Sequence, residues 1–177
     1  MLFRSGVGYI QSLRDANPAW RGDTGPALVL GAGGAARAIV VGLLDEGVPE
    51  VRISNRTEEK AQALKEAFGD RVTVVPWAQR NVAMDGVSLL VNTTTQGMHG
   101  QPALDVVLDA LPAHAMVSDA IYIPQETPLL EAARLRGHQT VNGLGMLLNQ
   151  ARPAFEAWFG VRPEITPALL AAVQATF

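Results

Sequence analysis

The stretch that decides the fold reads Leu28-Val29-Leu30-Gly31-Ala32-Gly33-Gly34-Ala35-Ala36-Arg37. An apolar strand runs here into a G-x-G-x-x-A turn, and the turn opens an amphipathic helix, as in dinucleotide-binding βαβ units. Gly31 permits the tight turn, Gly33 lets a pyrophosphate approach the backbone, and the amides at the helix start then face the phosphates. We therefore expect a bound dinucleotide contacted by Gly31, Ala32, Gly33, Gly34 and Ala35. The alternative is a flexible turn without a ligand.

Outward from this turn, short apolar runs alternate with longer amphipathic stretches, which predicts alternating strands and helices. The first, second and fourth runs are nearly continuous β-formers, as expected for central strands that helices cover on both faces. The sequence thus predicts an α/β protein with a Rossmann-like, doubly wound parallel sheet and helices on both faces. The expected strands are 27–30, 51–54, 72–75, 88–91, 115–119 and, more weakly, 139–141.

Helix signals lie between and beyond these strands. Thr57 and Thr127-Pro128 are typical helix starts, Gly137 and Gly160 are typical stops, and Pro153 should kink or break the helix that contains it. Residues 1–25 are interpreted as a truncated linker helix and turn, and residues 26–177 as the dinucleotide-binding Rossmann domain. We expect the N- and C-terminal helices to pack on this domain. The expected helices are 7–13, one after the glycine turn, one after Thr57, 128–136, 145–159 and 167–175.

Length and composition favour one globular domain that acts on a small molecule. The 177 residues are 48% hydrophobic and 18% charged, with a formal net charge of −3 and no cysteine. Thiol nucleophiles and disulfides are therefore excluded, and the three histidines lack a ligand spacing, so we expect no metal site. The mild acidity argues against nucleic acid and anionic membranes as partners. Because no apolar stretch reaches about 18 residues and no signal peptide is present, we expect a cytoplasmic protein.

The cofactor type should be set just after the second strand, at Ser54-Asn55-Arg56-Thr57. NAD sites usually place an acid here to bind the ribose hydroxyls, and this sequence has none. A guanidinium can pair with a 2′-phosphate in a fork geometry, so Asn55, Arg56 and Thr57 favour NADP. The alternative is that Arg56 is an ordinary solvated residue and Thr57 merely a helix cap.

Three further segments place polar groups after strands, where an open α/β sheet forms its ligand crevice. Thr93 and Thr94 follow the fourth strand, Tyr122 follows the fifth, and Met146 and Gln150 lie on a helix after Gly143. Each has a structural alternative: a threonine-rich turn, a core tyrosine, and a methionine that only packs.

In their order along the chain and in their amino-acid sequence, these segments resemble the C-terminal NADP-binding domain of shikimate dehydrogenases. The resemblance rests on GAGGAAR at 31–37, N-R-T at 55–57, N-T-T-x-x-G-M at 92–98, D-x-x-Y-x-P-x-x-T-P-L-L at 119–130 and N-G-x-x-M-L-x-x-Q-A at 142–151. It implies that the glycine turn and N-R-T bind NADP, and that Thr93 and Thr94 line the cofactor crevice. It also implies that Ile121, Gly143 and Met146 border the nicotinamide, while Tyr122 and Gln150 contact shikimate or 3-dehydroshikimate.

The chain also departs from that family's pattern. Family members carry an N-terminal substrate domain of about a hundred residues, with a Ser-x-Ser clamp, a catalytic Lys and an Asp within N-T-D-G. Ser5 stands where that Asp is expected, and the only lysines, Lys60 and Lys65, fall on the exposed face of a helix remote from the strand ends. Without a general acid or base, a dehydrogenase cannot move the proton that accompanies the hydride. We therefore expect no catalytic residue in this chain.

Several functional hypotheses stay open on the sequence alone. The first is the cofactor half of an NADP-dependent shikimate dehydrogenase, an oxidoreductase of the chorismate pathway that supplies aromatic amino acids. The second is a stand-alone NADP-binding or sensing module, or one half of a split enzyme whose N-terminal substrate domain is a separate chain. A quinate-accepting relative is a variant of the first. A methyltransferase is disfavoured, because Asn55-Arg56 replaces the acid that would hold the ribose of its cofactor.

Overall fold

A six-stranded parallel sheet forms the centre of the computed structural model, which describes residues 2–176 and the side chains of residues 5–176. The strand order is β3-β2-β1-β4-β5-β6, and every neighbouring pair is parallel. This order confirms the predicted Rossmann-like fold. The strands are β1 (Ala27–Leu30), β2 (Val51–Ser54), β3 (Val72–Val75), β4 (Leu89–Asn92), β5 (Met116–Asp119) and β6 (Thr140–Val141).

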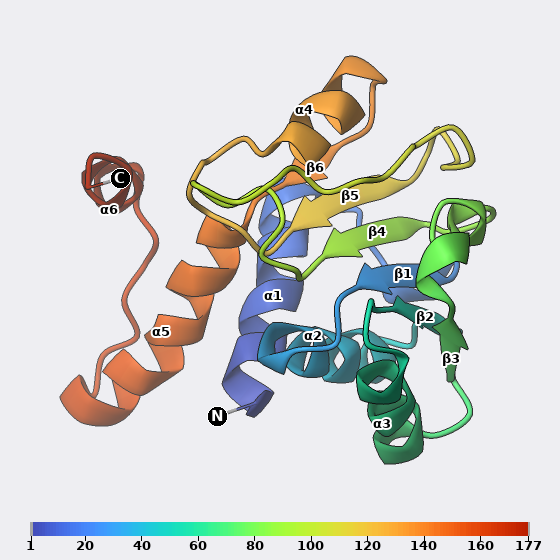
Figure 1. Cartoon of the computed structure of the whole chain (residues 1–177). Helices are drawn as coiled ribbons and strands as arrows, with labels where there is room; N and C mark the ends of the chain where they lie inside the picture. Colours follow the sequence, from blue (N-terminus) through green and yellow to red (C-terminus); the bar gives the residue numbers. More distant parts are fainter. Residues whose placement is uncertain (1, 177) are drawn as a thin grey trace.

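Helices cover both faces of this sheet, as Figure 1 shows, with α1, α2 and α3 on one face and α4 on the other. Short 3₁₀ turns at Gly22–Thr24, Trp77–Gln79 and Val82–Met84 complete the connections. The helices are α1 (Leu2–Ala16), α2 (Gly34–Asp45), α3 (Glu58–Phe68), α4 (Pro128–Leu135), α5 (Gly143–Phe159) and α6 (Pro167–Gln174).

Two hydrophobic cores lie on opposite faces of the sheet, because side chains alternate along each strand. In β1, Val29 belongs to the core under α1, α2 and α3, whereas Leu28 and Leu30 belong to the core under α4. All three side chains are fully buried. Burial on both faces explains why the strands read as continuous apolar runs in the sequence.

The connection from β4 to β5, residues 93–115, contains no helix. Leu104, Leu108 and Leu111 bury their side chains against the α4 core and cover the sheet in a helix's place. Arg80 fixes this segment: its Nε donates to the Asp105 carbonyl at 2.8 Å and its Nη2 to the Asp105 carboxylate at 2.7 Å. The segment is thus held by side-chain packing and one buried guanidinium.

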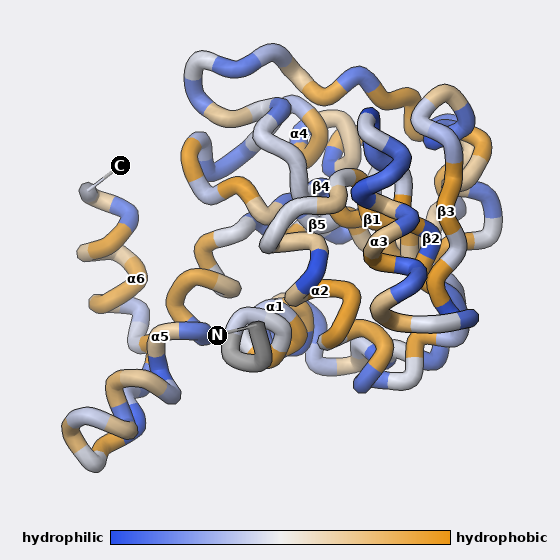
Figure 2. Tube along the Cα trace, turned by 60° about the horizontal axis from the view of Figure 1, so that its bottom comes forward, coloured by the Kyte–Doolittle hydropathy of each residue, from blue (hydrophilic) through white to orange (hydrophobic). Residues whose placement is uncertain are grey.

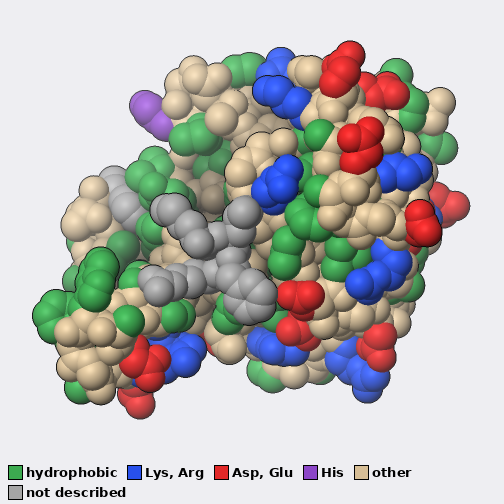
Figure 3. Space-filling model, turned by 90° about the horizontal axis from the view of Figure 1, so that it is seen from below, with side chains coloured by type: hydrophobic (Ala, Val, Ile, Leu, Met, Phe, Trp, Pro, Cys, Tyr) green, Lys and Arg blue, Asp and Glu red, His purple; other side chains and the backbone are tan. Residues whose placement is uncertain are grey.

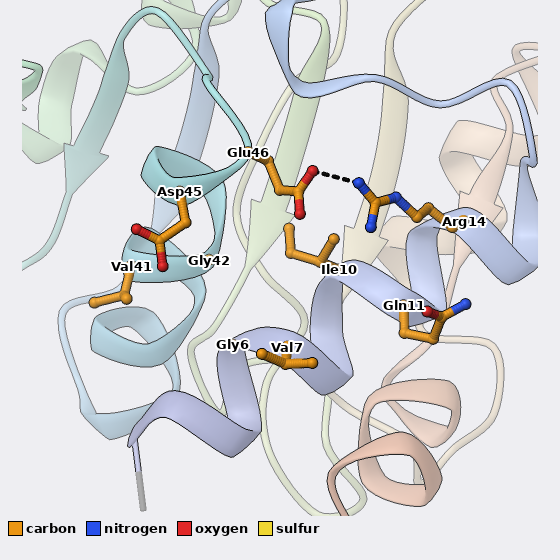
Figure 4. Close-up of a pocket in the computed structure, with 9 residues that line it drawn as sticks. All are labelled: Gly6, Val7, Ile10, Gln11, Arg14, Val41, Gly42, Asp45 and Glu46. Carbon is orange, nitrogen blue, oxygen red and sulfur yellow. Dashed lines mark hydrogen bonds and ion pairs between the residues drawn. The ribbon is translucent and has the colours of Figure 1, made fainter.

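The first helix is longer than the expected 7–13 and packs tightly between α2 and α5. Gly6 makes the contact with α2 possible, since a Cβ there would lie 2.7 Å from the Ala38 carbonyl oxygen. Figure 4 shows this contact, with the ion pair between Arg14 and Glu46 at its edge. Tyr9, Ile10 and Leu13 belong to the core on this face.

The last two helices differ in part from expectation. Asn142 caps α5 with its side-chain oxygen, so the helix begins at Gly143 rather than residue 145, and it continues through Pro153 without breaking. The helix α6 forms where predicted; it buries none of its residues fully, and its Gln174 side-chain amide donates to the Gln125 side-chain oxygen at 3.3 Å. Figure 2 shows α6 and the end of α5 standing apart from the sheet.

Hydrophobic side chains gather at that end of α5 (Figure 3, left). The exposed fractions are 42% for Phe155, 78% for Trp158 and 64% for Phe159. Large exposed aromatic residues in one place are typical of a surface that another protein segment covers.

Two properties of the described residues bear on the kind of site to look for. No helix among them is long and apolar enough to cross a membrane. No three of their His, Asp or Glu side chains are grouped so that they could hold a metal ion.

Candidate functional site

The carboxyl ends of the strands meet at one edge of the sheet, around a topological switch point between β1 and β4. The chain proceeds from β1 to β2 on one side and returns to pair β4 on the other. Leu30 lies in register with both Ser54 and Asn92, so the loops after β1, β2 and β4 begin at the same level. Open α/β sheets bind their ligands in the crevice outside such a switch point.

The turn after β1 has the geometry that the glycine pattern predicts. Gly31 has a φ of +109°, its N–H donates to the Ser54 carbonyl at 2.8 Å, and a Cβ at this position would lie 2.4 Å from the Thr93 hydroxyl oxygen. A side chain would therefore be both strained and in collision. Ala32 follows and packs partly against the core.

The start of α2 is open for a ligand. Gly33 is the N-cap and Gly34 the first helical residue, and a Cβ at either position would meet nothing within 4 Å. The first backbone N–H groups of a helix have no intrahelical acceptor, and together with the helix dipole they attract anions. Gly33, Gly34 and Ala35 thus present free amide donors to the crevice.

Residues 55–57 follow β2, beside the glycine turn. The Asn55 side-chain amide donates to the Thr57 carbonyl at 2.7 Å, which fixes this short turn. Thr57 is the N-cap of α3, but its side chain accepts no helix N–H, so the capping bond expected of it is absent. Arg56 is exposed, and within the described part of the chain its guanidinium makes no ion pair or hydrogen bond. Its donors are therefore available to an anion.

The two threonines after β4 bind protein atoms with their hydroxyls. Thr93 donates to the Leu30 carbonyl at 2.8 Å. Thr94 donates to the Asn92 side-chain oxygen at 2.8 Å and accepts from the Gln96 N–H at 3.1 Å. Their hydroxyls hold the loop next to the glycine turn, a structural role that the sequence left open.

A hollow of about 260 Å³, open to solvent, lies at the ends of β5 and β6 and reaches the start of α2. Of the predicted residues it brings together Gly34, Ala35, Tyr122, Gly143, Met146 and Gln150. Asn55, Arg56, Thr57, Thr93, Thr94 and Ile121 do not line it. It joins the start of α2, where the phosphates are expected, to the residues expected on the substrate side.

Three lining residues of this hollow were not predicted as site residues: Ser5, Ala120 and Leu147. The Ser5 hydroxyl donates to the Gln150 side-chain oxygen at 2.9 Å. Because that oxygen is engaged, the Gln150 amide nitrogen is the group left to face a ligand. The two residues are separated by 145 positions, so no local sequence signal could have paired them.

Asp119, at the end of β5, is the first residue of the D-x-x-Y motif, and its carboxylate is fully buried. Burial raises its pKa above the ordinary value, an effect that hydrogen bonds from the Ile121 N–H, Thr127 and Asn92 oppose. Ile121 is itself buried, with its N–H 3.0 Å from the carboxylate. The loop that carries Tyr122 therefore starts from a buried charge.

Family comparisons agree with this geometry. Residues 21–99 match the family described as shikimate / quinate 5-dehydrogenase, and residues 143–174 match the shikimate 5′-dehydrogenase C-terminal domain. The chain is 55% identical over 170 residues to the shikimate dehydrogenase (NADP(+)) of Dinoroseobacter shibae, and 52% identical over 166 residues to that of Paramagnetospirillum magneticum. These alignments cover 96% and 94% of this chain, but 61% and 60% of the relatives. The chain thus spans about three-fifths of the length of these relatives.

Solved structures give the same family. A shikimate 5-dehydrogenase from Thermus thermophilus, in complex with NADP(H) and shikimate, has a TM-score of 0.77 and 34% identity, over 91% of this chain and 58% of that one. The quinate dehydrogenase from Corynebacterium glutamicum, in complex with NAD, has a TM-score of 0.82 and 28% identity, over 90% and 58%. Sequence motifs, family matches and fold agree over nearly the whole chain, and the protein belongs to the shikimate dehydrogenase family of oxidoreductases.

Proposed function

We propose that this chain is the cofactor-binding part of an NADP-dependent dehydrogenase that interconverts 3-dehydroshikimate and shikimate. The observation that carries the proposal is the hollow in which the open start of α2 meets Tyr122, Met146 and Gln150. One ligand bound to the glycine turn can reach the substrate side of this hollow. The identity to shikimate dehydrogenases (NADP(+)) supports the choice of cofactor and substrate.

The residues of the crevice fit NADP. Gly33 and Gly34 leave open space for the pyrophosphate, and the free guanidinium of Arg56 lies after β2, where the ribose 2′-phosphate of NADP is expected. When bound, NADP supplies or accepts the hydride. The chain's own residues bind and orient it: Gly31 to Ala35 and Asn55 to Thr57 hold the phosphates, Thr93 and Thr94 shape the crevice, and Ile121, Gly143 and Met146 border the nicotinamide. Tyr122 and Gln150 contact the substrate.

The substrate domain is the second part of the proposal. The chain covers about three-fifths of its relatives, and the exposed aromatic residues at the end of α5 offer an apolar surface to a partner. We propose that the remaining part of the enzyme, an N-terminal substrate domain, completes the hollow. If that domain is a separate chain, the enzyme is split; if there is none, the protein is a stand-alone NADP-binding or sensing module.

Cofactor preference tests the first part of the proposal. The purified chain should bind NADPH about 10- to 100-fold more tightly than NADH, because a charge-assisted contact to the 2′-phosphate is worth about 1.5–3 kcal/mol. Isothermal titration calorimetry measures both affinities. Arg56→Ala should remove most of the preference, whereas Lys65→Ala, which removes a cation from the far end of α3, should keep it. Equal affinities for NADPH and NADH, or a preference that survives in Arg56→Ala, would contradict the NADP assignment.

The substrate side is tested in a mixture of this chain with a separately expressed N-terminal domain of a relative. In that mixture Gln150→Ala should raise the KM for shikimate about 5- to 10-fold, as expected when one hydrogen bond to a polar ligand is lost. The dissociation constant of NADP should stay unchanged, because Gln150 is assigned to the substrate and not to the cofactor. A variant that changes NADP binding and leaves the KM for shikimate unaltered would refute the placement of Gln150.

A further inference from the structure

One buried carboxylate accepts hydrogen bonds from several of the segments on the substrate side of the crevice. Asp119 is the last residue of β5 and is 0% exposed. Its Oδ1 accepts from the Asn92 side-chain amide at 3.0 Å and from the Ile121 N–H at 3.0 Å, and its Oδ2 accepts from the Thr127 hydroxyl at 2.8 Å. The three donors come from the end of β4, the loop after β5 and the N-cap of α4.

Through Asn92 the carboxylate also fixes the loop after β4. The Asn92 side-chain oxygen accepts from both the N–H and the hydroxyl of Thr94, at 3.0 and 2.8 Å. Its amide donates to the Gln96 carbonyl at 3.2 Å in addition to Asp119. The amide orientation is thereby defined, since the nitrogen must face the carboxylate.

The loop after β6 is fixed through the same point. The Ile121 N–H donates to Asp119, and the Ile121 carbonyl accepts from the Gly143 N–H at 2.9 Å. Gly143 in turn begins α5, which carries Met146 into the hollow. Three loops that meet at the crevice therefore depend on one side chain.

None of the hydrogen bonds made by Asp119 reaches the glycine turn or residues 55–57. Those segments are held by the Gly31 N–H on Ser54 and by the Asn55 amide on Thr57. The crevice thus has a phosphate half at β1 and β2 and a second half at β4, β5 and β6, and Thr93 joins the two through its bonds to the Leu30 carbonyl.

We propose that Asp119 is a positioning residue that holds the nicotinamide and substrate half of the crevice in shape, while the phosphate half forms without it. The inference rests on the proposed function, because it takes the ligand to be a nicotinamide dinucleotide whose ends lie in the two halves. Asp119 does not touch the ligand; it acts through the loops of Thr94, Ile121 and Gly143.

A carboxylate suits this position because it offers only acceptors to the donors around it. Burial of the charge is unfavourable, and it raises the pKa of Asp119 above the ordinary value. Asparagine has the same shape, keeps an acceptor for Asn92 and Ile121, and can donate to the Thr127 hydroxyl, so Asp119→Asn should preserve the arrangement. Alanine leaves all three donors without an acceptor.

The test compares two ligands in each variant of the isolated chain by titration calorimetry. NADPH occupies both halves, whereas adenosine 2′,5′-bisphosphate carries the 2′-phosphate and no nicotinamide. Asp119→Ala should lower the affinity for NADPH about tenfold and leave the affinity for the bisphosphate within about twofold of wild type. Asp119→Asn should keep both affinities near wild type. The measured quantity is the ratio of the two affinities, which a partly unfolded sample does not change because unfolding weakens both ligands equally.

A second variant keeps the test decisive should Asp119→Ala not fold. Thr127→Val removes the donor to Asp119, and Thr166→Val is its matched control. Each threonine caps a helix that begins with proline and accepts from a leucine N–H, at 3.4 Å for Thr127 and 3.2 Å for Thr166, but Thr166 has no contact with Asp119. Thr127→Val should lower the affinity for NADPH relative to that for the bisphosphate about threefold, and Thr166→Val should leave this ratio unchanged.

The outcomes separate this inference from the proposed function. A ratio equal to wild type in both Asp119→Ala and Thr127→Val would overturn the positioning role. A wild-type chain that binds neither ligand would overturn the proposed function, and the inference with it. Loss of NADPH alone, with recovery in Asp119→Asn, supports the role, because a general loss of structure would weaken both ligands.

Discussion

The purified chain, mixed with NADP⁺ and shikimate, is expected to form no measurable NADPH. Any rate should lie at least about 10⁴-fold below that of a completed enzyme. Oxidation of an alcohol releases a proton with the hydride, and a positioned base contributes about 10²–10⁴-fold to such a step. Among the described residues lining the hollow, Tyr122 is the only ionisable side chain. Lys60 and Lys65 lie on α3, outside the hollow. Loss of the groups that orient the substrate adds a further factor.

A spectrophotometric assay at 340 nm measures this rate, and the control is the same chain with the N-terminal part of the Dinoroseobacter shibae relative added as a separate protein. We expect the mixture to turn over, because the added part brings the substrate-binding groups that family members carry there. Robust turnover by the chain alone would refute the expectation. In that event Tyr122→Phe would show whether the tyrosine hydroxyl is the missing acid or base.

The fold was largely predictable because its signals are local. Each apolar run became a strand within one residue of its expected bounds, since strands covered on both faces need continuous apolar side chains. The glycine pattern predicted the turn after β1, and Gly31 has the positive φ that makes glycine necessary there. The start of α5 was missed by two residues, because Asn142 was not recognised as its cap.

What could not be predicted depends on residues far apart in the chain. The bond between Ser5 and Gln150 joins positions 145 apart, and that between Asn92 and Asp119 joins positions 27 apart. A single sequence carries no periodicity for such pairs, so the bonds that fix the loop after β4 could not be predicted. The exposure of α6 has a related cause: an apolar helix predicts burial, but not the surface that provides it.

The same distinction between local and long-range causes applies to two glycines, Gly34 and Gly143, which each occupy the first position of a helix. The sequence assigned both to the cofactor. In the structure, a Cβ at Gly34 would meet nothing within 4 Å, whereas a Cβ at Gly143 would lie 2.1 Å from the Ala120 carbonyl oxygen. Gly143 is therefore required by packing between α5 and the loop after β5, whatever binds beside it.

Gly143→Ala is accordingly expected to lower the free energy of unfolding by about 3 kcal/mol or more, the upper range for overpacking, because its new methyl group collides with backbone rather than with a side chain that could turn away. For a chain of this size that corresponds to a fall in Tm of about 6–12 °C. Gly34→Ala, the same change at the same helix position, should leave stability unchanged or raise it by up to about 1 kcal/mol, since alanine favours helix and the space is free. Thermal and urea unfolding of the pair decides the matter: similar stabilities in the two variants would mean that the Ala120 carbonyl does not approach α5 as closely as described, and that Gly143 is free to serve the cofactor alone.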